Sequence, residues 1–158
     1  MKILFVCSSN ICRSPFCEYI LKREISNNPA LKNKIEWVKS AAVFNQSFVI
    51  HPKARLALKR EGFSDEEISK HRPAFKWFSP KRFKEADVII GMSKLNKPFV
   101  PFWWKKKFIT ISELVDGEYS EVPDPWLYKD IERYYAVMDR LKDYVERYAK
   151  QIENDKNR

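Results

Sequence analysis

The residues best suited to chemistry lie in one short stretch near the N-terminus. Cys7 is followed at the sixth position by Arg13, and then by Ser14 and Pro15. The residues between the cysteine and the arginine can curl so that successive N–H groups point inward, and such a nest beside a helix N-terminus binds tetrahedral oxyanions. Arg13 adds a planar fork that matches two phosphate oxygens. The stretch therefore predicts a phosphate-binding loop.

The positive field of this loop would favour the thiolate form of Cys7, and the Ser14 hydroxyl can donate a hydrogen bond to that sulfur. A thiolate beneath a bound phosphate is an in-line nucleophile. The alternative, a small core cysteine, would require the cysteine, the arginine and the Ser-Pro pair to coincide by chance. For Cys17, further along the chain, we expect that core role.

A nucleophile of this kind needs a general acid to protonate the departing alkoxide or phenoxide. Asp124 lies between two prolines, in the sequence Val-Pro-Asp-Pro-Trp. Flanking prolines stiffen a loop and can hold an acid without help from a helix or a sheet. An Asp-Pro pair alone is most simply a turn, but beside the Cys7 loop we interpret Asp124 as the acid.

The elements that must position these residues follow from the apolar pattern. Bare apolar runs, typical of strands buried in a parallel sheet, cover residues 2–6, 35–38, 87–92 and 108–111. Helix signals fall between them, and we expect helices from Ser14-Pro15 to the Asn27-Asn28-Pro29 stop, over 53–61 ending at Gly62, from Ser64, from Ser79-Pro80 and from Asp130 onward. This alternation predicts a parallel α/β fold with its ligand at the carboxyl ends of the strands. The last helix is expected to pack on the sheet, with a coiled-coil dimer as the alternative.

Composition limits the function further. The 158 residues predict a single domain over 1–158, with 153–158 as a frayed tail. A net charge of +9 favours anionic partners without choosing among them. The three cysteines, an odd number clustered near the N-terminus, are not a secreted disulfide framework, so we expect a cytoplasmic protein.

The chain resembles the low-molecular-weight protein tyrosine phosphatases over essentially its whole length. The resemblance is carried by Cys7 to Pro15, including Asn10 and Cys12, and by the Asp124-Pro125-Trp126 acid loop, Ser40-Ala41-Ala42 and the segment 87–96. It implies an α/β fold: a three-layer doubly wound sandwich around a four-stranded parallel sheet, with the phosphate-binding loop after the first strand.

The resemblance also implies a two-step reaction without metal or organic cofactor. Cys7 attacks phosphotyrosine while Asp124 protonates the phenolate, and water then attacks the cysteinyl-phosphate with Asp124 as base. Arg13 and the loop amides hold the phosphoryl oxygens throughout. The implied partners are phosphotyrosine proteins or small aryl phosphates, with inorganic phosphate as a product inhibitor and no nucleic acid.

The remaining site residues follow from the same resemblance. The expected phosphate-binding and substrate-binding residues are Ser8, Ser9, Asn10, Ile11, Cys12, Ser14 and Trp126. Ser40 and His71 resemble the supporting network, although His71 alone could be an ordinary surface histidine. Phe44 or Phe48 is expected to form an aromatic wall of the cleft. The chain departs from the family pattern at Ser93, at His51-Pro52 and at Trp126-Leu127.

Two further hypotheses concern regulation and location. Cys12 is close enough in sequence to trap an oxidised Cys7 as a reversible disulfide, as the resemblance suggests. The segment Pro98–Lys107 places aromatic residues beside three lysines. We expect those aromatics to pack inward, with membrane or partner docking by Trp103–Lys107 as the alternative.

Three other functions compete with this interpretation. An arsenate reductase of the same fold would need further cysteines, and none follows Cys17. A non-catalytic phosphotyrosine-binding module would not need both Cys7 and Asp124. Nucleic-acid binding rests only on the positive charge, because the basic residues form no recognisable motif.

Overall fold

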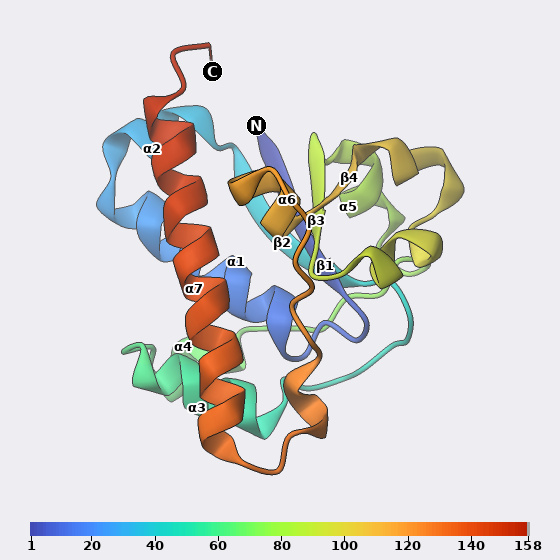
Figure 1. The fold of residues 1–158 in the computed structure, drawn as a ribbon, viewed down its shortest axis with the longest axis vertical. Helices are drawn as coiled ribbons and strands as arrows, with labels where there is room; N and C mark the ends of the chain where they lie inside the picture. The colour runs from blue at the N-terminus through green and yellow to red at the C-terminus, as the bar shows by residue number, and fades with distance from the viewer. Residues whose placement is uncertain (158) are drawn as a thin grey trace.

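The computed structural model describes residues 1–157, and its centre is a four-stranded sheet (Figure 1). Every strand pair is parallel, in the order β2-β1-β3-β4. The strands are β1 (Lys2–Cys7), β2 (Trp37–Ala42), β3 (Val88–Gly91) and β4 (Phe108–Thr110). Since β1 is a central strand, its carboxyl end at Cys7 lies between two neighbours, where a parallel sheet places its ligands.

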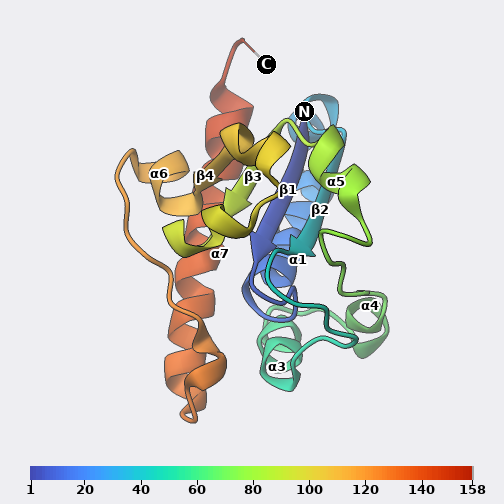
Figure 2. The same ribbon diagram turned by 90° about the vertical axis from the view of Figure 1, so that its right-hand side faces the viewer.

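Helices cover both faces of the sheet, as the turned view in Figure 2 shows, so the expected α/β class is confirmed. They are α1 (Arg13–Asn27), α2 (Pro29–Lys34), α3 (Pro52–Arg60), α4 (Asp65–Ser69), α5 (Pro80–Glu85), α6 (Ile111–Asp116) and α7 (Ile131–Asn154), with 3₁₀ turns η1 (Lys94–Phe99), η2 (Phe102–Lys107) and η3 (Pro125–Leu127). Within residues 1–157, every helix is too short or too polar to cross a membrane.

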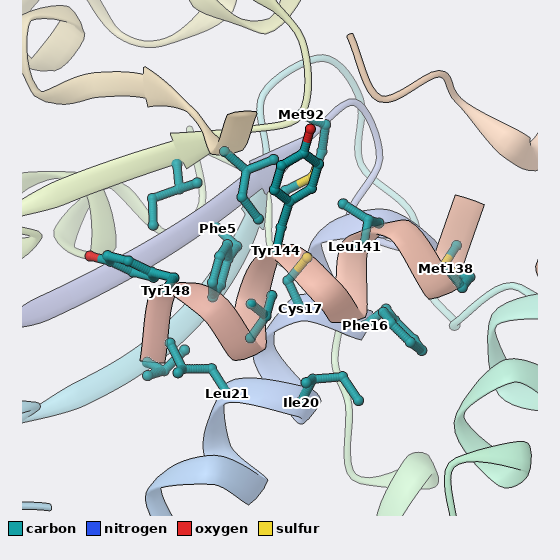
Figure 3. Packing of buried hydrophobic residues seen from close by; sticks show 14 of the residues in the cluster. Phe5, Phe16, Cys17, Ile20, Leu21, Met92, Met138, Leu141, Tyr144 and Tyr148 are labelled. Carbon is teal, nitrogen blue, oxygen red and sulfur yellow. The ribbon is translucent and has the colours of Figure 1, made fainter. Parts of the chain in front are cut away.

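The core has two parts because successive residues of β1 point to opposite faces of the sheet. Ile3 and Phe5 pack towards α1 and α7, whereas Leu4 and Val6 pack towards α5. Figure 3 shows the first part, in which the Cys17 side chain lies among apolar side chains of α1 and α7. Cys17 is fully buried, and burial raises the pKa of its thiol. The expected core role of Cys17 is therefore confirmed.

The long helix α7 packs its apolar face inside the molecule. Its buried residues include Tyr134, Met138, Leu141, Val145, Tyr148 and Ile152, and the helix lies against α1. This packing on the chain's own core, and not on a second copy, is what we expected. The helix also includes 153 and 154, which we had assigned to a frayed tail; Lys34 Nζ donates to the carbonyl oxygens of Ile152, Glu153 and Asp155 at 2.8–3.0 Å, which holds this end. Position 158 of the expected tail lies outside the described residues.

Several boundaries differ from expectation for local reasons. The second strand runs to Ala42 rather than Val38, because Ala41 and Ala42 are buried and continue the parallel ladder with β1. The Asn27-Asn28-Pro29 signal ends α1 but also starts α2, where the Asn28 side chain accepts from the Ala30 N–H. The fourth strand stops at Thr110, whose hydroxyl forms a capping box that begins α6.

The Ser14-Pro15 signal predicts Ser14 as the cap and Pro15 as the first helical residue, but the first helix begins two residues earlier, at Arg13, and Cys12 precedes it without a side-chain cap. Ser14 was expected to cap this helix. Its hydroxyl instead bonds to Cys7 and Asn10, because it lies in the first turn and faces the end of β1. The predicted capping box at Ser64 and the predicted helix stop at Gly62, whose φ is positive, are confirmed. Asp130 caps α7.

Candidate active site

The loop after β1 turns its carbonyl groups outward. The carbonyl oxygens of Cys7, Ser8 and Ile11 accept hydrogen bonds from backbone N–H groups of residues 43–45 and 51. The N–H groups of residues 9–12 donate to none of the described residues. With the carbonyls bonded on the outside, the inner face of the loop is left to N–H groups, which is the arrangement of an anion-binding nest.

Asn10 holds this loop in shape. Its φ of 59° lies in the left-handed region, which asparagine tolerates better than most residues. Its fully buried amide is satisfied on both sides. The Nδ2 group donates to Ser14 Oγ at 2.9 Å and to Ser40 Oγ at 2.8 Å. The Oδ1 atom accepts from the Ala74 N–H at 3.0 Å, which fixes the amide orientation.

This network sets the direction of the hydrogen bond at the cysteine. Because Ser14 Oγ accepts from Asn10, its own hydrogen is free to point at Cys7 Sγ, 2.9 Å away. Ser40 likewise accepts from Asn10 and donates to Glu18 Oε1 at 2.5 Å. Ser14 is therefore the donor to the sulfur.

Arg13 lies at the start of α1, and its guanidinium is almost fully buried. Nη1 donates to the Val122 carbonyl at 2.9 Å, and Nη2 lies 3.4 Å from Asp124 Oδ2. Its Nε is buried and has no partner among the described residues. A buried N–H without an acceptor costs free energy, so this atom is available to an anion in the adjacent cavity.

Asp124 lies directly before η3 (Pro125–Leu127), more than a hundred residues after the loop, and lines the same cavity as Arg13. Its Oδ1 accepts from the Trp126 N–H at 3.3 Å, so the carboxylate itself caps η3. Asp124 remains partly exposed, unlike Arg13. The carboxylate thus has access to both the arginine and solvent.

These groups surround one cavity of about 230 Å³. The residues lining it are Cys7, Ser8, Ser9, Ile11, Cys12, Arg13, Asn45, Ser47, His51, Asp124 and Trp126. Every expected catalytic and loop residue is present except Asn10 and Ser14, which lie behind the loop. A cavity of this size accommodates a phosphate group with part of the side chain that carries it.

His71 is not an ordinary surface histidine. Its Nε2 lies 2.9 Å from the carbonyl oxygen of Asn10, and since a carbonyl only accepts, His71 is the donor. Burial lowers the pKa of His71 from 6.5, and the bond to Asn10 opposes this in part. His71 and Ser40 therefore both bond to Asn10 on the outer side of the loop, as expected of residues that support the loop.

Cys12 lines the same cavity as Cys7. Burial raises the pKa of the Cys12 thiol to about 12, partly opposed by the Tyr134 hydroxyl. Cys12 is therefore a thiol at neutral pH. No disulfide links the cysteines here, and the Cys7–Cys12 link stays a prediction.

Sequence reasoning missed three of the residues that line the cavity. Neither Phe44 nor Phe48 lines the cavity; Asn45, Ser47 and His51 do. Asn45 Oδ1 accepts from Ser9 Oγ at 2.5 Å, which draws this part of the segment onto the loop. The one sequence signal near these residues was the departure from the family pattern at His51-Pro52.

A parallel α/β sheet whose first loop presents a cysteine and an arginine around an anion-sized cavity defines a phosphatase architecture. A family model described as "Low molecular weight phosphotyrosine protein phosphatase" matches residues 2–158. The chain belongs to this family, and it is accordingly a phosphoric monoester hydrolase.

Similar proteins fall into two groups by the substrate in their names. The protein-arginine-phosphatase of Bacillus subtilis is 28% identical over 99% of each chain. A putative low molecular weight protein-tyrosine-phosphatase of Synechocystis is 32% identical over 90% of each.

Solved structures give the same division. A YwlE arginine phosphatase, a cysteine-to-serine mutant with a phosphorylated active-site serine, superposes with a TM-score of 0.82 at 26% identity over 99% of each chain. A low molecular weight protein tyrosine phosphatase from T. tengcongensis gives 0.78 at 30% identity over 96% of this chain and 99% of that one.

Proposed function

We propose that this chain is a protein tyrosine phosphatase that hydrolyses phosphotyrosine through a cysteinyl-phosphate intermediate. Cys7 is the nucleophile, Arg13 holds the phosphoryl oxygens, and Asp124 is the general acid and then the general base. The observation that carries the proposal is the meeting of these three side chains at one cavity, although they come from distant parts of the sequence.

In the first step, the sulfur of Cys7 forms a bond to phosphorus while the bond from phosphorus to the phenolic oxygen breaks. Asp124 gives its proton to that oxygen, so the leaving group departs as a neutral phenol. Arg13 Nε and the inward N–H groups of the loop bind the equatorial oxygens, where charge is concentrated in the transition state.

In the second step, a water molecule attacks phosphorus on the side opposite the sulfur. Asp124, now a carboxylate, takes a proton from that water, and Cys7 leaves as a thiolate that Ser14 stabilises by its hydrogen bond. Inorganic phosphate is released and competes with substrate for the same loop. The enzyme then returns to its initial state.

The choice of substrate rests on the walls above the loop. Ile11 and Trp126 give the cavity apolar surface, and an aromatic ring stacks and buries well against such walls. A phosphoarginine guanidinium carries several N–H groups that need acceptors; the side chains of Ile11 and Trp126 offer none, and the lining side chains that can accept are those of Asn45, Ser47, His51 and Asp124, with the serines of the loop. Phosphoarginine is the second candidate, because the relatives named as arginine phosphatases match the whole chain.

Two matched phosphopeptides test this choice, one with phosphotyrosine and one with phosphoarginine at the same position. We expect kcat/KM for the phosphotyrosine peptide to be higher by about twofold to tenfold, the range that corresponds to one good aromatic contact. Preference for the phosphoarginine peptide would overturn the substrate assignment but leave the mechanism intact.

The adjacent residues Trp126 and Leu127 provide a controlled test of the wall. Both are more than half exposed, but only Trp126 lines the cavity. Trp126→Ala should raise KM for aryl phosphates, whereas Leu127→Ala should leave it unchanged. Equal effects of the two substitutions would argue against a substrate wall at Trp126.

We also propose that the protein acts in the cytoplasm. All three cysteines are free thiols, and a cysteine nucleophile works only while it is reduced, which a reducing compartment ensures. Cell fractionation with an antibody against the chain tests this, and recovery in an oxidising compartment would contradict it.

A further inference from the structure

A second surface of the molecule combines exposed aromatic rings with lysines. It is formed by residues 75–78 and by the segment 94–107, which lies at the right-hand edge of the molecule in Figure 1. We call it the aromatic–lysine face. Its exposed large apolar side chains are those of Trp77, Phe78, Leu95, Phe99, Phe102 and Trp103.

The face is anchored to the core beneath it. Trp104 is half-buried and stacks on Phe83 of α5, with ring centroids 6.4 Å apart. Lys107 Nζ donates to the carbonyl oxygens of Phe83 and Lys84. The expectation that the aromatics of 98–107 pack inward is therefore correct for Trp104 and wrong for Phe102 and Trp103, which are 80% and 68% exposed.

The charge of the face is entirely positive. No Asp or Glu occurs in residues 72–84 or 94–107. Among the described residues, Lys97, Lys105 and Lys106 form no ion pair. Lys76 lies over the rings of Trp77 and Phe99, and burial together with the charge of Lys105 lowers its pKa. These unbalanced cations make the face complementary to an anionic surface.

We propose that the aromatic–lysine face docks on the surface of an anionic lipid membrane. Phe102 and Trp103, adjacent and protruding from η2, enter the headgroup region, while the following lysines contact the lipid phosphates. Aromatic rings beside lysine are the residue types that a bilayer interface accommodates, since the ring enters the apolar boundary and the ammonium group stays at the headgroups. Both rings are exposed to water in the free protein, and insertion into a membrane would remove their apolar surface from water.

Docking in this orientation places the cavity close to the membrane. The Phe99 ring contacts the Phe44 ring edge-on, with centroids 5.2 Å apart, and the next residue, Asn45, lines the cavity. A membrane-bound enzyme would thus present its cavity to phosphorylated segments near the bilayer. The docking itself does not rest on the proposed function, because binding is measured without catalysis.

Co-sedimentation with vesicles tests the proposal. We expect the intact protein to sediment with vesicles of phosphatidylcholine and phosphatidylserine, but not with phosphatidylcholine alone. Lys105→Gln with Lys106→Gln should weaken binding by about tenfold or more, since each lysine near an anionic surface contributes roughly a fivefold factor. Phe102→Ser with Trp103→Ser should weaken it as well, and brominated lipids should quench tryptophan fluorescence of the wild type but much less that of the second variant.

Two control variants separate docking from general attraction to a basic protein. Lys32→Gln with Lys150→Gln removes the same charge from exposed sites outside the face, and Leu56→Ser removes an exposed apolar side chain on α3. Both should bind as the wild type does, and all variants should retain turnover of p-nitrophenyl phosphate. The proposal would be overturned if the wild type failed to bind anionic vesicles, or if the face variants and the control variants lost binding equally. Binding of an acidic peptide but not of vesicles would also overturn it, and would make the face a protein-docking site.

Discussion

Arg13 Nη2 lies 3.4 Å from Asp124 Oδ2, although 110 intervening residues separate the two side chains along the sequence. The arginine is buried and the carboxylate is partly exposed, so Arg13 lies deeper in the protein than Asp124. In the proposed mechanism, this relationship places the general acid next to the phosphate clamp, where the oxygen of the leaving group would be.

Asp124→Asn tests the acid directly. The amide keeps the size of the side chain but cannot transfer a proton, so turnover of p-nitrophenyl phosphate should fall about 10²–10³-fold. Asp130→Asn is the matched control, because Asp130 caps α7 outside the cavity and asparagine is also a good cap. Unchanged turnover in Asp124→Asn would show that another group supplies the proton.

Ser14→Ala removes the donor to the sulfur. A hydrogen bond to a charged group contributes about 1.5–3 kcal/mol, so kcat should fall roughly 10–100-fold. Alkylation of Cys7 by iodoacetamide should slow in parallel, which a merely structural role would not cause. Ser26→Ala, which removes an exposed hydroxyl on the same helix, should change neither rate; if Ser14→Ala behaves the same way, the sulfur does not depend on this bond.

Asn10→Ala should destabilise the fold as well as the site. The substitution leaves the Ala74 N–H without its acceptor and places alanine at a φ of 59°, so we expect the free energy of unfolding to fall by about 2–4 kcal/mol. Urea denaturation measures this loss. Asn45→Ala, an exposed change at the cavity wall, should cost far less, and equal losses would contradict the role given to Asn10.

His71 should make the stability depend on pH. Its pKa in the folded protein lies below 6.5 because it is buried, so the unfolded chain binds the proton more readily. Stability should therefore be highest above about pH 6.5 and fall as the pH decreases below that value. His71→Gln should reduce this fall in urea midpoint. Part of the fall should remain, because burial also lowers the pKa of His51 and because hydrogen bonds and nearby cations lower the pKa of Glu61, Asp65, Glu67 and Glu113. Parallel curves for wild type and His71→Gln would show that His71 does not titrate in this range.

The loop and the sheet were predictable because their signals are local. The spacing from Cys7 to Arg13 and the apolar run of β1 lie within fifteen residues, so both can be recognised in the sequence before the distant contacts that hold them are known. The position of Asp124 at the cavity was predictable only in combination, because an Asp-Pro turn becomes informative only beside the proposed nucleophile Cys7.

The cavity wall was not predictable because it depends on packing. The Phe44 ring packs against the ring of Phe99, fifty-five positions later in the chain, and does not line the cavity. The next residue, Asn45, lines it instead. The outward position of Phe102 and Trp103 has the same kind of cause, because only Trp104 finds a partner, Phe83, in the core beneath. No local pattern distinguishes one aromatic residue from its neighbour in such runs.

The central claim is that the sulfur of Cys7 carries the phosphoryl group. Rapid acid quenching during turnover of a phosphotyrosine peptide, followed by mass spectrometry, should find one phosphate on the peptide that contains Cys7. Cys7→Ser should show no turnover of p-nitrophenyl phosphate, while Cys17→Ala should keep it. Turnover that survives in Cys7→Ser, or phosphate found on a different residue of the wild type, would contradict the account.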